Sequence, residues 1–197
     1  MSIAVRFGRL AAALSIAAAL VGCAHPITMN TSTAPERVEA KLVQKKVAYA
    51  LTDADRGKQV ITPGGGGDRV SYFPYRDLEK SIRDALRAVY QDVVVVKSAT
   101  DLEAIKTSGA TLVFTPQIKT DSSSPSPFTW PPTIFKTEIS CTVTDASGAA
   151  VTQVSATGDG TAEFSEFKAD FGLSAKRAAA DVSEKLSQQI RNNEKLR

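Results

Sequence analysis

The pattern of apolar and polar positions opens with one long apolar run. After Arg6 and Arg9, residues 10–21 are almost wholly Ala, Leu, Ile and Val, and no acidic residue occurs before the run ends. A basic start, a short apolar centre and a small-residue end are typical of a secretory signal peptide. The alternative is a short transmembrane helix, but spanning takes about 20 apolar residues. We therefore predict that residues 1–22 are a cleaved signal peptide.

Further along, apolar and polar positions alternate in several short stretches, as they do in β-strands. Strands are expected at 45–53, at 93–96, at 112–119 and, as a hairpin that turns at 145–148, over 135–157. Every second residue from Phe135 to Val143 is expected to face the same side of the hairpin. Pro116 cannot donate a hydrogen bond to a neighbouring strand, so we expect a sheet edge or a bulge at that position.

Other stretches show the 3.6-residue period of a helix. One helix is expected at 75–91 and a long closing helix at 173–193, each with an apolar stripe. Thr100-Asp101-Leu102-Glu103 is a capping-box pattern and predicts a short helix between strands. The predicted fold is α+β: a mixed or antiparallel sheet of about five strands, in the order β-α-β-α-β-β-β-α, with the long C-terminal helix packed on it.

Two polar stretches are expected to lack regular structure. Residues 23–40 are polar, with two prolines and no periodicity, so they are expected to form a flexible tether before a single α/β domain at 41–197. Gly64–Gly67 invites comparison with a phosphate-binding loop. That loop would end in Gly-Lys-Ser/Thr, whereas Asp68 and Arg69 follow here, so we expect a mobile connection.

Composition narrows the function classes. Arg6 and Arg9 belong to the signal peptide, which leaves 22 of the 24 basic residues against 21 acidic residues. This balance gives no basic footprint for nucleic acid. The two cysteines are Cys23 and Cys141, and Cys141 lies in a strand pattern, so we expect no disulfide and a buried thiol.

The chain contains few of the side chains that catalytic sites commonly use. The single histidine, His25, falls in the expected tether, outside the folded domain. Ser-His, Cys-His and histidine-based metal sites are therefore not expected. Carboxylate pairs such as Glu163 with Glu166 occur, as in any soluble domain. We expect no enzyme activity, no metal and no cofactor.

The segment 121–133 contains four prolines and a run of serines, so it is expected to be a loop. It holds the single tryptophan, Trp130, with Phe128 before it and Phe135 just after. Because loops run over the surface, this trio is a candidate contact with a membrane or a partner. The alternative is that Trp130 folds back and closes the core, as buried tryptophans do.

The four residues that end the apolar run, Leu20-Val21-Gly22-Cys23, match the signal of bacterial lipoproteins. This resemblance implies cleavage between Gly22 and Cys23, a diacylglycerol thioether on Cys23 and a fatty acyl group, such as palmitate, on the new amino group. Ala24 is not Asp, which by the same resemblance favours the outer membrane. The alternative is an ordinary secretory signal in which the cysteine is coincidental.

The order of elements, the Tyr75-Arg76-Asp77-Leu78 helix start and the lipoprotein signal together resemble small periplasmic α/β lipoproteins of the uncharacterised YajG type. The resemblance to PelC-type lipoproteins of export machines is more distant. The chain departs from the YajG type in its Trp130 loop. In PelC-type proteins a loop tryptophan meets the membrane, and Trp130 is an analogue of it, not a matched position.

Two functions follow as hypotheses. The first is a non-catalytic lipoprotein, anchored to the outer membrane and facing the periplasm, that serves as an accessory or assembly subunit and contacts an envelope protein or its own copies. The second is a carrier or sensor of an apolar ligand, held between helices and sheet near Phe114, Ile139 and Cys141.

Overall fold

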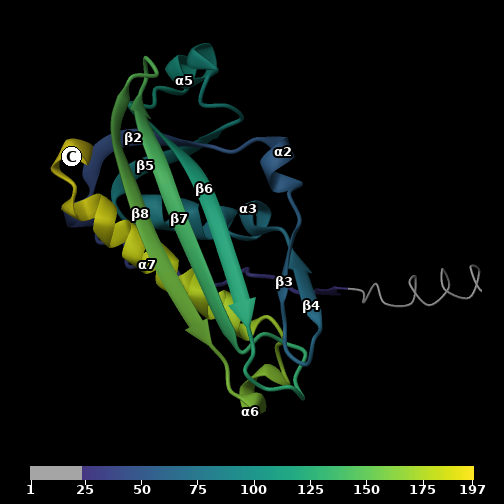
Figure 1. Ribbon diagram of the computed structural model, residues 1–197. Helices are drawn as coiled ribbons and strands as arrows, with labels where there is room; N and C mark the ends of the chain where they lie inside the picture. The colour runs from purple at the N-terminus through teal and green to yellow at the C-terminus, as the bar shows by residue number, and fades with distance from the viewer. Residues whose placement is uncertain (1–23) are drawn as a thin grey trace, which may run out of the picture.

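The computed structural model describes residues 24–197, arranged around two sheets (Figure 1). The predicted signal peptide, with Gly22 and Cys23, lies outside the described residues. The larger sheet has five strands in the order β5-β2-β6-β7-β8, and the smaller has three in the order β1-β4-β3. The mixed α+β fold with a sheet of five strands is as predicted, whereas the smaller sheet was not expected.

The larger sheet combines both strand directions. Its strands are β2 (Val43–Ala50), β5 (Tyr90–Val96), β6 (Leu112–Ser123), β7 (Ile134–Asp145) and β8 (Ala150–Thr161). β2 runs parallel to both β5 and β6, while β7 pairs antiparallel with β6 and with β8. The predicted hairpin is therefore confirmed, and its two strands form one side of the sheet.

Eight helical elements lie between and after the strands along the described part of the chain. They are η1 (Glu39–Lys41), α2 (Asp53–Arg56), α3 (Pro74–Asp77), α4 (Glu79–Arg87), α5 (Leu102–Ser108), α6 (Phe164–Phe167), α7 (Leu173–Asn192) and η2 (Glu194–Leu196). The long helix α7 lies across β7 and β8 and also contacts α4 (Figure 1). Within residues 24–197, no helix combines the length and apolar character needed to cross a membrane.

Two glycines bring α7 unusually close to the sheet. A Cβ at Gly158 would lie 2.4 Å from the carbonyl oxygen of Ala178, and one at Gly160 would lie 2.0 Å from that of Ser174. No side chain fits at either position without moving the helix. The small residues on both elements thus allow backbone to pack directly on backbone, and the buried stripe of α7 reaches the core.

The core lies between α7, α4 and the inner face of the larger sheet. Phe114, Ile139 and Cys141 are fully buried in it, and burial raises the pKa of the Cys141 thiol to about 12. A smaller cluster beneath α5 includes Ile105 and Val113. The hollows described below are lined by residues other than Phe114, Ile139 and Cys141.

The segment after the signal peptide is part of the folded domain. The strand β1 (His25–Pro26) pairs with β4 (Arg69–Tyr72), which pairs in turn with β3 (Val60–Pro63). Met29 is fully buried, and its N–H donates to the Asp77 carboxylate at 3.2 Å. Arg37 Nη1 donates to the Tyr90 carbonyl oxygen at 3.0 Å. The flexible tether that we expected over residues 23–40 is therefore wrong from His25 onward, because these residues find hydrogen-bond partners and a place in the core.

Candidate functional site

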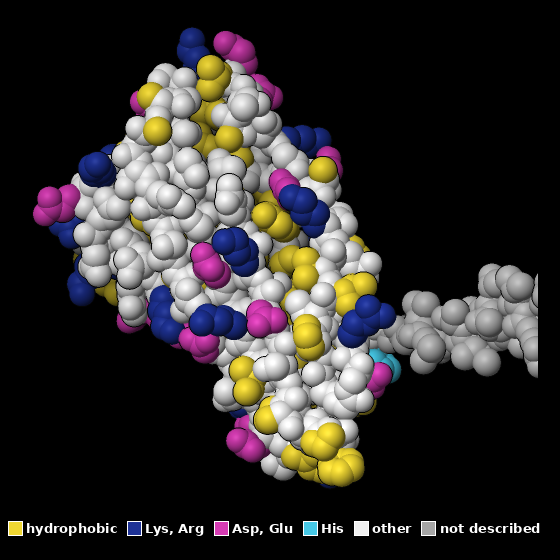
Figure 2. Space-filling model, viewed as in Figure 1, with side chains coloured by type: hydrophobic (Ala, Val, Ile, Leu, Met, Phe, Trp, Pro, Cys, Tyr) yellow, Lys and Arg dark blue, Asp and Glu magenta, His cyan; other side chains and the backbone are white. Residues whose placement is uncertain are grey.

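Three exposed apolar side chains, including the two most exposed large ones, lie at one end of the larger sheet. Phe128 is 93% exposed in the loop between β6 and β7, Phe164 is 57% exposed at the start of α6, and Ile134 is 46% exposed at the start of β7. These three residues are called the apolar tip. Figure 2 shows apolar atoms gathered at the lower end of the molecule, where Figure 1 places α6. Exposed apolar patches mark surfaces that contact a partner or a membrane.

Behind the apolar tip lies a groove of about 400 Å³. Its apolar walls come from Pro125, Ile134, Phe164 and Phe167. The Phe164 and Phe167 rings meet edge to face with their centres 5.2 Å apart, and Lys168 Nζ lies 4.7 Å from the centre of the Phe164 ring. The tip thus carries a cation directly beside its apolar surface.

The four-glycine stretch holds the tip loop in place. Gly65 N–H donates to the Trp130 carbonyl oxygen at 3.0 Å. A Cβ at Gly65 would lie 1.7 Å from the Thr129 carbonyl oxygen, and one at Gly64 would lie 2.2 Å from that of Trp130. The glycines therefore let two loops touch backbone to backbone. The mobile connection expected here is instead a packed support for the tip.

Trp130 is half-buried and lies between two other rings that are tilted against it. Its ring centre lies 4.2 Å from that of His25 and 4.7 Å from that of Phe171. It also packs against the main core. Of the two interpretations of Trp130, closure of the core is the one that this geometry favours, while its loop neighbour Phe128 carries the exposed surface.

Phe135 does not belong to the exposed trio. It is 0% exposed, and its ring meets the edge of the Tyr72 ring with centres 5.3 Å apart. Phe135 therefore contributes to the core and its prediction as a contact residue is wrong. Sequence reasoning missed Phe164 and Ile134 in turn. The available signal was a phenylalanine set among glutamates and a serine, at Glu163–Glu166, where burial was not to be expected.

Charged side chains near the tip are tied to one another. Arg177 Nη2 donates to Glu166 Oε1 at 2.7 Å, and the Glu163 N–H donates to Glu166 Oε2 at 2.9 Å. Arg177 and then this backbone hydrogen bond lower the pKa of Glu166 to about 2. The Glu163–Glu166 pair is a capping box for α6, so the pair has a structural role at the start of the helix.

Polar clusters elsewhere also join elements. Tyr49 OH donates to Glu79 Oε1 at 2.8 Å, and Arg56 Nε donates to Glu79 Oε2 at 3.0 Å. Burial and Glu79 raise the pKa of Tyr49. This cluster fastens α2 and α4 to β2. In the part of the chain that the structure describes, no group of three or more His, Cys, Asp or Glu side chains is placed to hold a metal ion. His25 Nε2 lies 3.5 Å from Asp68 Oδ2, at the surface.

Comparison with known proteins gives a likeness of fold. No family model and no curated protein matches the chain. Among solved structures, a Xanthomonas campestris protein of the DUF330 family superposes with a TM-score of 0.50 at 11% identity, over 85% of this chain and 92% of that one. A PelC dodecamer from Paraburkholderia phytofirmans gives a TM-score of 0.43 at 17% identity, over 79% and 94%. A point variant of that PelC gives 0.41 at 16%, over 79% and 95%.

At these identities the likeness concerns the fold alone. The superposition covers most of this chain and nearly all of the DUF330 protein. It agrees with the small α/β fold that the sequence resemblance implied.

Proposed function

We propose that the protein is a non-catalytic lipoprotein of the outer membrane that faces the periplasm, serves as an accessory or assembly subunit, and rests its apolar tip on the bilayer. The observation that carries the proposal is the place of Phe128, which is 93% exposed on the same loop as Trp130. Trp130 stacks on His25, and Cys23 precedes His25 by two residues. A lipid on Cys23 would therefore begin within about 7 Å of extended chain from His25.

The tip would add to the binding free energy of the anchor. One acyl chain holds a protein only marginally, but the diacylglycerol and the further acyl group expected on Cys23 would together make attachment stable. Contacts of the tip would therefore act mainly on the orientation of the domain. Full burial of a phenylalanine side chain stabilises by about 1.5–3 kcal/mol. Lys168, beside Phe164, would add about 1 kcal/mol near anionic headgroups. Phe128 and Phe164 would then set how the domain stands on the membrane.

The test uses the lipidated full-length protein in liposomes that contain brominated lipids. Trp130 is the single tryptophan and follows Phe128 by two residues on the same loop, so its fluorescence reports on how near this loop lies to the lipid. Bromine should quench Trp130 in the parent protein and quench it at least twofold less in Phe128→Asp, because a carboxylate resists burial in the bilayer. Leu102→Asp is the matched control, since Leu102 is 43% exposed in α5 at the opposite end (Figure 1). Equal quenching in all three proteins would refute the membrane contact.

The groove behind the tip favours a second candidate, carriage of an apolar ligand. Its volume of about 400 Å³ and its phenylalanine walls suit an acyl chain, at a place other than the expected one near Phe114. Lipid that co-purifies with the parent protein and is lost from Ala162→Phe, which fills the groove, would support this role. Purified protein without lipid would exclude it.

A further inference from the structure

The outer strand β8 has an edge that is closed at one end and free in its middle. At the tip end, Asp159 N–H donates to Asp181 Oδ2 at 2.9 Å, and the Thr161 carbonyl oxygen accepts from Arg177 Nη1 at 2.7 Å. Both side chains come from α7. They occupy the backbone groups that β8 turns away from β7, so no further strand could pair there.

The middle of the same edge has no such cover. Alternate residues of a strand turn their backbone groups to the same side, so Gln153, Ser155 and Thr157 present their N–H and C=O groups outward, as Asp159 and Thr161 do. Across residues 24–197, no side chain or backbone group bonds to these outward groups. Residues 153–157 are therefore called the free window.

The free window lacks the usual protection of a sheet edge. Natural edges carry charged residues, prolines or bulges that prevent further pairing, whereas the window reads Gln-Val-Ser-Ala-Thr. The opposite edge strand, β5, carries a charged residue, Asp92, which is exposed and pairs with Lys46 Nζ at 3.1 Å. Residues 153–157 contain no charged residue and no proline.

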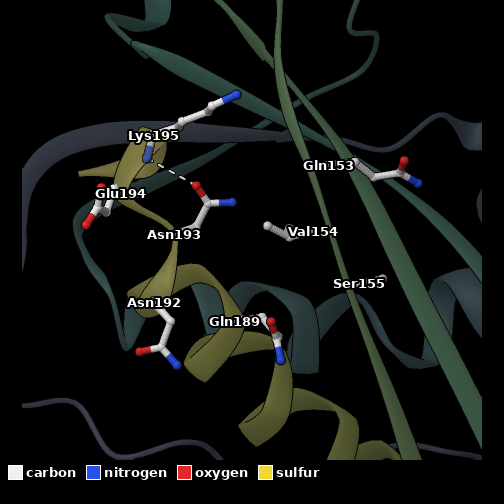
Figure 3. Close-up of a pocket in the computed structure, with 8 residues that line it drawn as sticks. All are labelled: Gln153, Val154, Ser155, Gln189, Asn192, Asn193, Glu194 and Lys195. Carbon is white, nitrogen blue, oxygen red and sulfur yellow. Dashed lines mark hydrogen bonds between the residues drawn. The ribbon is translucent and has the colours of Figure 1, made fainter.

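A hollow of about 510 Å³ lies beside the window (Figure 3). The strand lines it with the Val154 side chain and with the edge of the strand at Gln153 and Ser155, whose side chains point away from α7. The end of α7 contributes the amide side chains of Gln189 and Asn192, with Asn193 following. These amides both donate and accept hydrogen bonds. Glu194 and Lys195 also line the hollow and cancel in charge. The chemistry of the hollow therefore suits uncharged polar side chains.

We propose that the free window binds an extended, uncharged polar segment of a partner protein as an added β-strand. Backbone hydrogen bonds to Gln153, Ser155 and Thr157 would hold the segment, and alternate side chains would enter the hollow, which is how added strands are recognised. The proposal deepens the proposed role as an assembly subunit, because it names the surface and the kind of partner.

A second copy of the chain fits the window poorly. Antiparallel pairing of two β8 strands about Ser155 would place the two-fold axis across the strands and set the two apolar tips at opposite ends. Two molecules anchored at their tips in one membrane could not adopt this arrangement. If the proposed membrane anchoring holds, a two-fold pair of β8 strands is excluded, and the proposal commits to a segment of another protein as the occupant.

The test measures amide hydrogen exchange by NMR on the full-length lipidated protein in detergent micelles. The probe is a capped seven-residue peptide of alternating threonine and glutamine. Saturating peptide should slow exchange at Gln153, Ser155 and Thr157 at least tenfold, with little change at Val154, whose N–H faces β7. The same peptide with N-methyl groups on alternate residues, which removes the pairing donors, should have no effect.

A pair of variants repeats the test from the side of the protein. Ser155→Pro removes an outward N–H without removing a bond to β7, an arrangement that edge strands tolerate, and should abolish the effect of the peptide. Ser155→Ala keeps that N–H and should retain it. No slowing, equal slowing by the N-methylated peptide, or slowing without peptide that grows with protein concentration would each overturn the proposal. Trp130 quenching by brominated lipid is independent of all three results.

Discussion

At the scale of single residues, glycines decide how closely elements approach. Gly158 and Gly160 lie where α7 touches β8, and Gly65 lies where two loops meet. None of these contacts can be inferred from composition, because a glycine in a strand pattern also fits a bulge or a weakened strand. The close approach depends on the helix that crosses it, and that crossing is a long-range property.

Gly158→Ala should destabilise the protein by about 1–3 kcal/mol, because overpacking a filled contact forces the backbone apart. The midpoint of urea unfolding measures the change. Gly57→Ala serves as the control, since its Cβ would meet nothing nearer than 3.6 Å and Gly57 has an α-helical backbone. A Gly158→Ala midpoint equal to that of the parent would show that α7 does not press on this strand.

Of the two alternatives expected at Pro116, a sheet edge or a bulge, the structure shows an edge, since the register with β7 runs on without a shift. Ile118 N–H donates to Tyr75 OH at 3.2 Å, so it points away from β7, and Pro116 lies two residues earlier on the same side. β2 pairs with β6 only as far as Phe114. The strand is therefore interior at its start and an edge on that side from Pro116 onward, as the missing N–H requires.

At the scale of elements, two short segments support the apolar tip. The loop of β3 and β4 holds the Trp130 loop through Gly65, and α6 is fastened to α7 through the Glu166–Arg177 pair. Neither support follows from periodicity. The predicted capping box at Thr100 is wrong in detail, because Asp101 caps α5 by accepting from Ala104 N–H at 3.0 Å, and the box that forms is at Glu163.

Gly65→Val should detach the loop that carries Phe128, because its side chain would overlap the Thr129 carbonyl oxygen. Trp130 emission should shift to longer wavelength as water reaches the ring, and the melting temperature should fall by several degrees. Gly67→Asn should leave the emission unchanged, since nothing lies within 4 Å of a Cβ there and asparagine tolerates a positive φ. An unshifted spectrum in Gly65→Val would contradict the supporting role.

The Glu166–Arg177 pair should make α6 sensitive to acid. The folded-state pKa of Glu166 is lowered to about 2, so its contribution is present above the unfolded pKa of about 4.3 and is lost as the pH falls through about 2. Glu166→Gln should therefore melt below the parent at pH 7, and the gap should close near pH 2. The contribution is small because the pair is exposed. A gap of constant size would exclude this pair as its source.

At the scale of the whole molecule, the alternating and helical patterns predicted the larger sheet and its long helix well. The smaller sheet could not be predicted, because β1 has two residues and pairs with a strand more than 40 positions away, which leaves no local pattern. Phe135 was open to correction from the sequence itself. Its place in the alternation that ends at Val143 marked it as inward, and only its closeness to Trp130 suggested otherwise.

Arg37 should resist trypsin in the folded protein. Its guanidinium donates to the carbonyl oxygens of Arg87 and Tyr90, whereas a flexible tether would be cut within minutes at this position. Mass spectrometry of a time course measures the cleavage. Met29→Asp, which places a charge in the core beside Asp77, should release the segment and restore cutting after Arg37. Rapid cutting after Arg37 in the parent protein would mean that this segment is a flexible tether, as the sequence first suggested.

The pairing of β1 with β4 has a mechanical consequence. β1 begins two residues after Cys23. The link between a lipid on that cysteine and the folded domain would therefore be too short for the domain to rotate freely. The domain would stay next to the bilayer, and it would keep one orientation relative to neighbouring proteins. A force on the anchor would act first on the two-residue strand β1 and on the contact between the His25 and Trp130 rings. Because Trp130 and Phe128 share a loop, loss of that contact would also change the conformation of the apolar tip.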